Sequence, residues 1–67
     1  MDERTLLNMA NQIARNLAAQ GDAVAIAETC QHITDFWDPR MKAGIFAADT
    51  ASLCPIAAAA IAQLKSA

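Results

Sequence analysis

The sequence lacks the basic clusters that bind nucleic acids or anionic membranes. Its 67 residues include only five Lys and Arg, and these are scattered singly along the chain. Nucleic-acid binding depends on clustered Lys and Arg that displace counterions from phosphates, and anionic membrane surfaces attract similar clusters. Because the net charge is −2, we expect neither a nucleic acid nor a membrane as a partner.

The chain also lacks a hydrophobic run that is long enough to cross a membrane. The longest apolar stretch, residues 53–62, is about half of the roughly 20 residues that a spanning helix requires. The first residues are acidic, whereas a secretory signal begins with basic residues. We therefore expect a cytoplasmic protein, whose two cysteines, Cys30 and Cys54, are free thiols in the reducing cytosol.

Few side chains are available for catalysis or for binding a metal ion. The chain has one histidine and two glycines, and neither glycine belongs to a phosphate-binding loop. Cys30 and His32 are two residues apart, so on a helix they point away from each other and do not share a metal ion. His32 and Asp35 are three apart, which favours a surface ion pair or hydrogen bond over an acid–base role. The sequence thus predicts no catalytic, cofactor-binding or metal site in this chain.

Alanine accounts for much of the apolar content. Seventeen of the thirty-seven apolar residues are alanines, which favour helix but bury little surface. The expected core is therefore small, and a partner chain would supply the missing burial.

Apolar residues recur at intervals of three and four, which predicts an all-α fold. We expect one domain over residues 1–67, built as a compact bundle of about four short helices at residues 2–19, 23–37, 39–48 and 53–65.

Capping residues set the predicted ends of these helices. Gly21 is expected to end the first helix, and Asp22 to cap the second. Asp38 precedes Pro39, so Asp38 is predicted to cap the third helix. Pro55 is acceptable in the first turn of the last helix because its missing N–H has no intrahelical partner there.

The second predicted helix leads into the most distinctive segment, residues 32–41. The spacing of Ile26, Cys30, Ile33 and Trp37 predicts the buried stripe, with Phe36 at its edge, so Cys30 is expected to be an inert core thiol. Phe36 and Trp37 either fill the core or contribute to docking. Because Trp and Arg are enriched at interface hot spots, this corner is the first candidate for a docking surface.

Two segments resemble the delta subunit of soluble NAD-dependent formate dehydrogenases. They are Ala-Asn-Gln-Ile-Ala at residues 10–14 and, more specifically, His32-Ile33 followed by Phe-Trp-Asp-Pro-Arg-Met at residues 36–41. The resemblance covers most of the chain and thins after Gly44. It implies a small, non-catalytic accessory subunit of a cytoplasmic complex, dependent on molybdenum or tungsten, that oxidises formate to carbon dioxide and reduces NAD.

The resemblance also implies the partners and the cofactors of the complex. The larger subunits of formate dehydrogenase are the expected partners, and they hold the metal-pterin cofactor, the iron–sulfur clusters and FMN. The delta subunit would support assembly, stability or cofactor loading of the large catalytic subunit. The candidate docking residues lie in two places, and they are Asn11, Gln12, His32, Phe36, Trp37 and Arg40. The first two are expected on the exposed side of the first helix, and the other four lie in or near the corner after the second helix.

Two other functions are compatible with the sequence. One is a stand-alone helical assembly chaperone that self-associates, so that the isolated chain forms a homo-oligomer. The other is a thiol or metal sensor that uses Cys30, His32 and Cys54. Light scattering and metal analysis of the isolated chain distinguish these alternatives.

Overall fold

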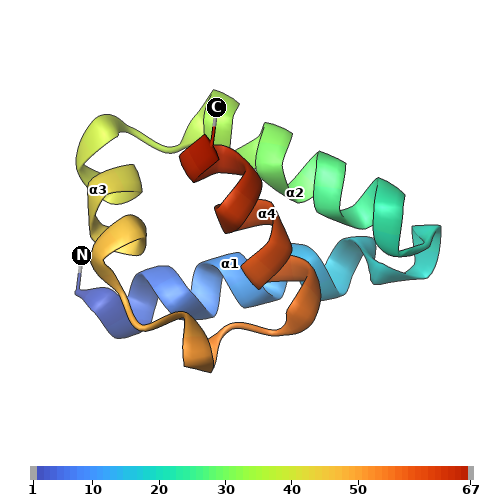
Figure 1. The fold of residues 1–67 in the computed structure, drawn as a ribbon, viewed down its shortest axis with the longest axis horizontal. Coiled ribbons are helices and arrows are strands. Elements are labelled where there is room, and N and C mark those ends of the chain that lie inside the picture. The colour runs from blue at the N-terminus through green and yellow to red at the C-terminus, as the bar shows by residue number, and fades with distance from the viewer. Residues whose placement is uncertain (1, 67) are drawn as a thin grey trace.

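All four predicted helices are present in the computed structural model (Figure 1). The structure describes residues 2–66, so Met1 and Ala67, the ends of the predicted domain, lie outside the described residues. No strand occurs within the described range, and the all-α prediction is confirmed. The helices are α1 (Glu3–Leu17), α2 (Asp22–Phe36), α3 (Pro39–Ala47) and α4 (Pro55–Ser66), with short 3-10 turns η1 (Ala18–Gln20) and η2 (Thr50–Ser52).

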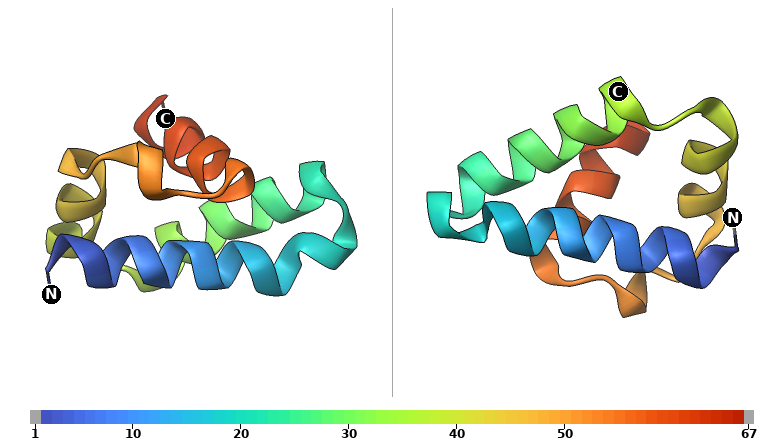
Figure 2. Two further views of the ribbon diagram at one scale, coloured as in Figure 1. Left: turned by 90° about the horizontal axis from the view of Figure 1, so that it is seen from below. Right: turned by 180° about the vertical axis from the view of Figure 1, so that it is seen from behind.

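The first two helices form an antiparallel pair that α3 and α4 complete. The pair α1 and α2 is joined at Gly21 and opens toward its other end, where α3 stands between the two helices (Figure 1). Figure 2 shows that α4 covers one face of this pair, and its contacts are mainly with α2. The domain measures 28 × 22 × 18 Å. Among residues 2–66, no helix has both the length and the hydropathy that crossing a bilayer demands.

Aspartates cap the starts of α1 and α3. The Asp2 carboxylate accepts a hydrogen bond from the backbone N–H of Thr5 at 2.8 Å, and this bond lowers the pKa of Asp2. The Asp38 carboxylate accepts from the N–H of Met41, also at 2.8 Å, with Pro39 at the first helical position. The predicted cap at Asp38 is therefore confirmed, because its side chain pairs an N–H that the helix leaves free.

The junction between α1 and α2 differs from the prediction. Instead of continuing to residue 19, α1 ends at Leu17 and tightens into η1, which Gly21 terminates with a φ of +97°. This left-handed conformation favours glycine and allows the chain to reverse. Asp22 is the first residue of α2 and not its cap, since no side chain caps this helix. Its carboxylate still lies in the first turn, where the helix dipole favours negative charge.

The start of the last helix was also predicted too early. Residues 50–52 form η2, whose start Asp49 caps by accepting from the N–H of Ala51 at 2.9 Å. Leu53 is buried but lies outside the helix, and α4 begins at Pro55. Proline suits this first position because its φ is already helical and it has no N–H to leave unpaired.

The core lies between the helices, and the residues of α2 that pack into it differ in part from the predicted ones. Ile33 is fully buried as expected, but Ile26 and Cys30 are only half-buried, while Ala25 and Thr29 are completely buried. The buried face is thus shifted by one residue, which brings small side chains to its centre and allows α4 to come close. The core cluster consists of Leu6, Leu7, Ala10, Ala14, Ile33, Trp37, Ile45, Ala48, Leu53, Ala57 and Ile61.

Gly44 explains how α3 packs against α1. A Cβ atom built at Gly44 would lie 2.5 Å from Cδ1 of Leu6, which is itself buried. Glycine weakens a helix interior, but here it permits the close approach of the two helices.

Candidate functional site

Phe36 and Trp37, at the end of α2, lie in opposite environments. Trp37 is 5% exposed and belongs to the core, whereas Phe36 is 74% exposed. Trp37 is the residue at which the helix ends, and its backbone is extended (φ −86°, ψ 135°). This change of backbone conformation separates the two neighbouring side chains. Trp37 therefore fills the core, and Phe36 remains on the surface.

The exposed Phe36 ring lies against His32, one turn earlier on α2. The two ring centroids are 4.8 Å apart and the ring planes are tilted by 42°, within the range for aromatic pairs. The expected pairing of His32 with Asp35 was wrong. The Asp35 carboxylate instead accepts a hydrogen bond from Nε2 of Gln31 at 2.9 Å, four residues earlier on the helix.

Asn11 acts within the fold and not on the exposed side of the first helix. Only 8% of its surface is exposed. Its Nδ2 donates to the carbonyl oxygen of Ser52 at 2.9 Å, and its Oδ1 accepts from the N–H of Cys54 at 2.8 Å. Asn11 thereby fastens the segment before α4 to α1. The spacing of four from Leu7, which places both residues on one helical face, is a signal for the burial of Asn11 but not for its partners.

Gln12, the neighbouring candidate, is exposed. Its Nε2 donates to Oδ1 of Asn16 at 3.1 Å, one turn later on α1. The helix thus places adjacent polar residues on different sides, one in the interior and one at the surface.

Arg40 and Lys42, on α3, have different surroundings. Arg40 is exposed and lines a depression of about 370 Å³ together with Leu6, Met41 and Gly44. The ammonium group of Lys42 donates to the carbonyl oxygen of Thr34 at 3.1 Å. This bond satisfies a carbonyl in the last turn of α2, where the helix has no partner for it.

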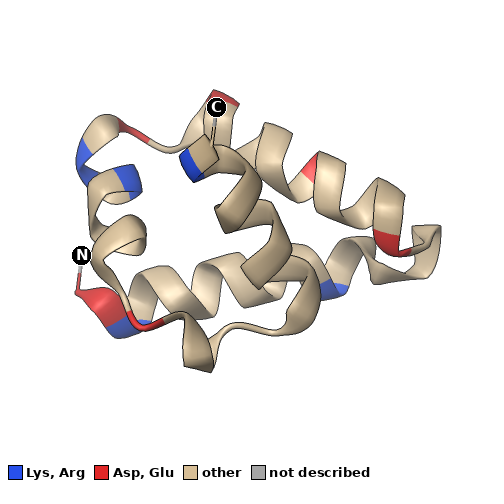
Figure 3. Cartoon of the chain, in the orientation of Figure 1, with Lys and Arg blue, Asp and Glu red and all other residues tan. Residues whose placement is uncertain are grey.

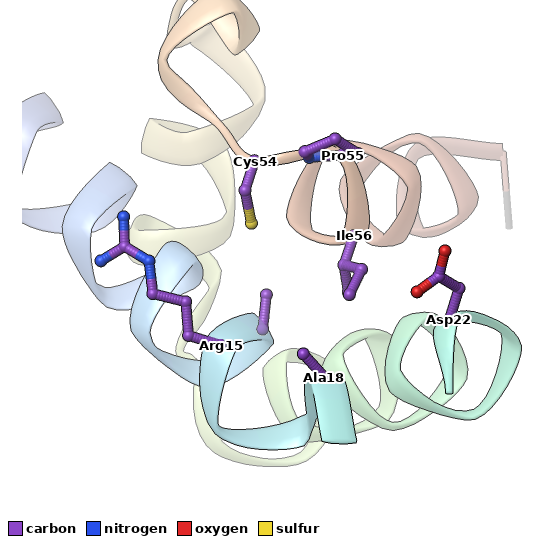
Figure 4. A pocket seen from close by; sticks show the side chains of 7 residues that line it. Arg15, Ala18, Asp22, Cys54, Pro55 and Ile56 are labelled. Atoms are coloured by element: carbon purple, nitrogen blue, oxygen red, sulfur yellow. The ribbon is translucent and has the colours of Figure 1, made fainter. Parts of the chain in front are cut away.

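A second depression lies where the end of α1 meets the starts of α2 and α4 (Figure 4). Its volume is about 270 Å³, and the thiol of Cys54 points into it. Arg15 and Asp22 stand at its edges, and its remaining lining is apolar: Ala14, Ala18, Pro55 and Ile56.

The cysteines and the histidine do not assemble into a metal site. Cys30 and Cys54 are free and half-buried. Over residues 2–66, no three His, Cys, Asp or Glu side chains converge in a way that would hold a metal ion. The Cys30, His32 and Cys54 set of the sensor alternative is therefore not brought together.

The helices α2 and α3 carry charges of opposite sign, as Figure 3 shows. The carboxylates of α2 are Asp22, Glu28 and Asp35, and this helix has no Lys or Arg. The charged residues of α3 are Arg40 and Lys42. The exposed aromatic pair of His32 and Phe36 therefore lies on an acidic helix.

The described residues form a small helical domain with an exposed aromatic pair on α2. A family model described as the NADH-dependent formate dehydrogenase delta subunit, FdsD, matches residues 5–61. Because the match covers most of the 67 residues, the chain belongs to this family, and the resemblance seen in the sequence is confirmed. Neither a curated protein sequence nor a solved structure shows significant similarity to it.

Proposed function

We propose that this chain is a non-catalytic accessory subunit of an NAD-dependent formate dehydrogenase and binds the large catalytic subunit of the complex. The family match over residues 5–61 is the observation that carries the proposal. In this role the chain supports assembly, stability or cofactor loading in the cytoplasm. The metal-pterin cofactor, the iron–sulfur clusters and FMN belong to the larger subunits.

The structure divides the candidate docking residues into two groups. Asn11 and Trp37 are buried and hold the fold together. The others are exposed and available for contact: Gln12, His32, Phe36 and Arg40. Three of these four lie at the end of α2 and the start of α3, so this corner is favoured over the side of α1.

The proposal is tested by producing the formate dehydrogenase subunits with and without this chain. We expect the large subunit made without it to contain less metal-pterin cofactor, or to dissociate faster from the complex, and to reduce NAD more slowly with formate. Metal content, subunit composition and activity are measured on both preparations. Equal values for all three, together with equal thermal half-lives, would refute an accessory role.

Adding the purified chain to the deficient complex separates the three roles. If the chain stabilises the finished complex, late addition restores both activity and thermal half-life. If it acts in cofactor loading, late addition restores neither, because the large subunit has already folded without its cofactor. If it acts in assembly, late addition raises the yield of complex only when the subunits are still separate.

A further inference from the structure

Four exposed residues form one ridge along α2. Val24, Glu28, His32 and Phe36 follow one another at intervals of four residues, and side chains with this spacing form a continuous row on a helix. Val24 is 44% exposed and Phe36 is 74% exposed. In the described part of the chain, these two are the large apolar side chains that the fold leaves exposed. They lie at the two ends of this row, which we call the α2 ridge.

The fold does not use the α2 ridge for its own packing. The buried positions of α2 are Ala25, Thr29 and Ile33, which lie on another face of the helix. Phe36 is the last residue of α2, and its ring contacts that of His32, which is also exposed. A phenylalanine in this position leaves a large apolar surface in water, and its burial against a partner is favourable.

The charged residues of α2 itself are acidic. Glu28 is in the ridge, Asp35 precedes Phe36, and α2 has no Lys or Arg (Figure 3). The nearest cations in the sequence are those of α3. Lys42 donates to the carbonyl oxygen of Thr34, and Arg40 lines the depression beside Leu6 and Gly44.

We propose that the α2 ridge is the surface that contacts the large catalytic subunit of formate dehydrogenase, an inference that rests on the function proposed above. Phe36 enters an apolar pocket of the large subunit, and Lys or Arg side chains at the edge of that pocket face Glu28 and Asp35. Complementary charges of this kind raise the association rate and fix the orientation of the partners.

A second copy of this chain is the alternative occupant. In a parallel two-fold contact Glu28 and Asp35 would approach their own copies, which is unfavourable, whereas in an antiparallel contact Glu28 would face His32 and Val24 would face Phe36. The family to which the chain belongs is described as a subunit of formate dehydrogenase, which favours another subunit of that enzyme as the occupant.

The test measures the affinity of wild-type and variant chains for a formate dehydrogenase complex that lacks this chain. Phe36→Ala is expected to weaken binding roughly thirtyfold, because truncating a buried aromatic anchor removes a hot spot. Gln63→Ala, at an exposed position of α4 that is not among the candidate docking residues, is the control and leaves the affinity unchanged. Circular dichroism of each isolated variant verifies that it is folded.

A second pair of variants tests the charge of the partner. Glu28→Gln and Glu3→Gln remove the same single charge, one from the ridge and one from the start of α1. We expect Glu28→Gln to weaken binding several-fold at low ionic strength and less at high salt, because salt screens exposed charges. Glu3→Gln is expected to bind like the wild type.

The outcomes separate this inference from the proposed function. If the wild-type chain binds neither the deficient complex nor the separate large subunit, the proposed function and the ridge inference both fail. If the wild type binds and Phe36→Ala binds equally well, only the ridge inference is overturned. If Phe36→Ala converts an oligomer of the isolated chain into a monomer without weakening binding to the complex, the ridge pairs copies of this chain and the inference is likewise overturned.

Discussion

The buried and the exposed faces of α2 carry different kinds of side chain. Ala25, Thr29 and Ile33 are completely buried, whereas Val24 and Phe36 are exposed. Hydropathy and size alone would place Phe36 inside before Ala25 or Thr29. Burial on this helix therefore depends on where α4 crosses it and on where the helix ends.

Close helix packing explains the small residues on the inner face. The buried positions of α4 are Ala57, Ala60 and Ile61, so alanines line both of the helices that meet here. Small side chains allow the helix axes to approach, but they bury little area in return. The larger apolar side chains of the α2 ridge then remain available for a partner.

The largest effect is expected from Trp37→Ala. Trp37 is buried in the core cluster, so truncation removes packing worth about 3 to 5 kcal/mol. This is comparable with the whole stability of a domain of this size. Chemical denaturation followed by circular dichroism should show an unfolded or barely folded chain. A loss below about 1 kcal/mol, typical of a surface substitution, would mean that the corner is not part of the core.

Overfilling the inner face is expected to have the next largest effect. Ala25→Leu adds three carbon atoms at a completely buried position, which typically costs about 1 to 3 kcal/mol. Ala27→Leu makes the same change at an exposed position of α2 and should leave the free energy of unfolding nearly unchanged. Equal tolerance of both substitutions in thermal melts would show that α2 and α4 are not closely packed.

Thr29→Val is expected to stabilise the chain. Within residues 2–66, the Oγ1 atom of Thr29 is buried and has no hydrogen-bond partner. Valine keeps the shape and removes the unpaired hydroxyl, so the free energy of unfolding should rise by about 1 kcal/mol. The matched control is Thr34→Val, because the hydroxyl of Thr34 is exposed and donates to the carbonyl oxygen of Cys30 at 2.9 Å. A loss of stability in Thr29→Val alone would show that its hydroxyl has a partner in solution.

The number of helices and the cap at Asp38 were predictable because they depend on local signals. Periodicity, a capping side chain and a following proline act within a few residues of each other. The same periodicity placed Ile33 and Trp37 correctly on the buried face of α2, but in the first half of the helix it missed the buried positions by one residue, about 100° around the helix. Ile26 was therefore predicted inside, although Ala25 is the buried residue. The position of α4 decides between them, and no local pattern contains that information.

The candidate site was harder to predict, because its residues depend on distant contacts. Asn11 bonds to the backbone of Ser52 and Cys54, about forty residues away, and nothing in the sequence near Asn11 reports those partners. For Phe36 and Trp37, the spacing placed Trp37 in the buried stripe and Phe36 at its edge, and the burial of Trp37 is confirmed. The backbone of Trp37, where the helix gives way to extended structure, separates their environments.

The smallest effect on stability is expected from Phe36→Ala. This variant removes an exposed aromatic side chain, whereas Trp37→Ala removes its buried neighbour. Because Phe36 is 74% exposed, its removal should change the free energy of unfolding by no more than about 0.5 kcal/mol. Denaturant titrations of Phe36→Ala and Trp37→Ala under identical conditions measure the difference between these two neighbours. A loss above about 1 kcal/mol for Phe36→Ala would mean that its ring supports the fold, and weaker binding of that variant would then reflect unfolding. With stability unchanged, any loss of affinity for the large subunit is attributable to the ring itself, since Phe36 then contributes to the contact and not to the fold.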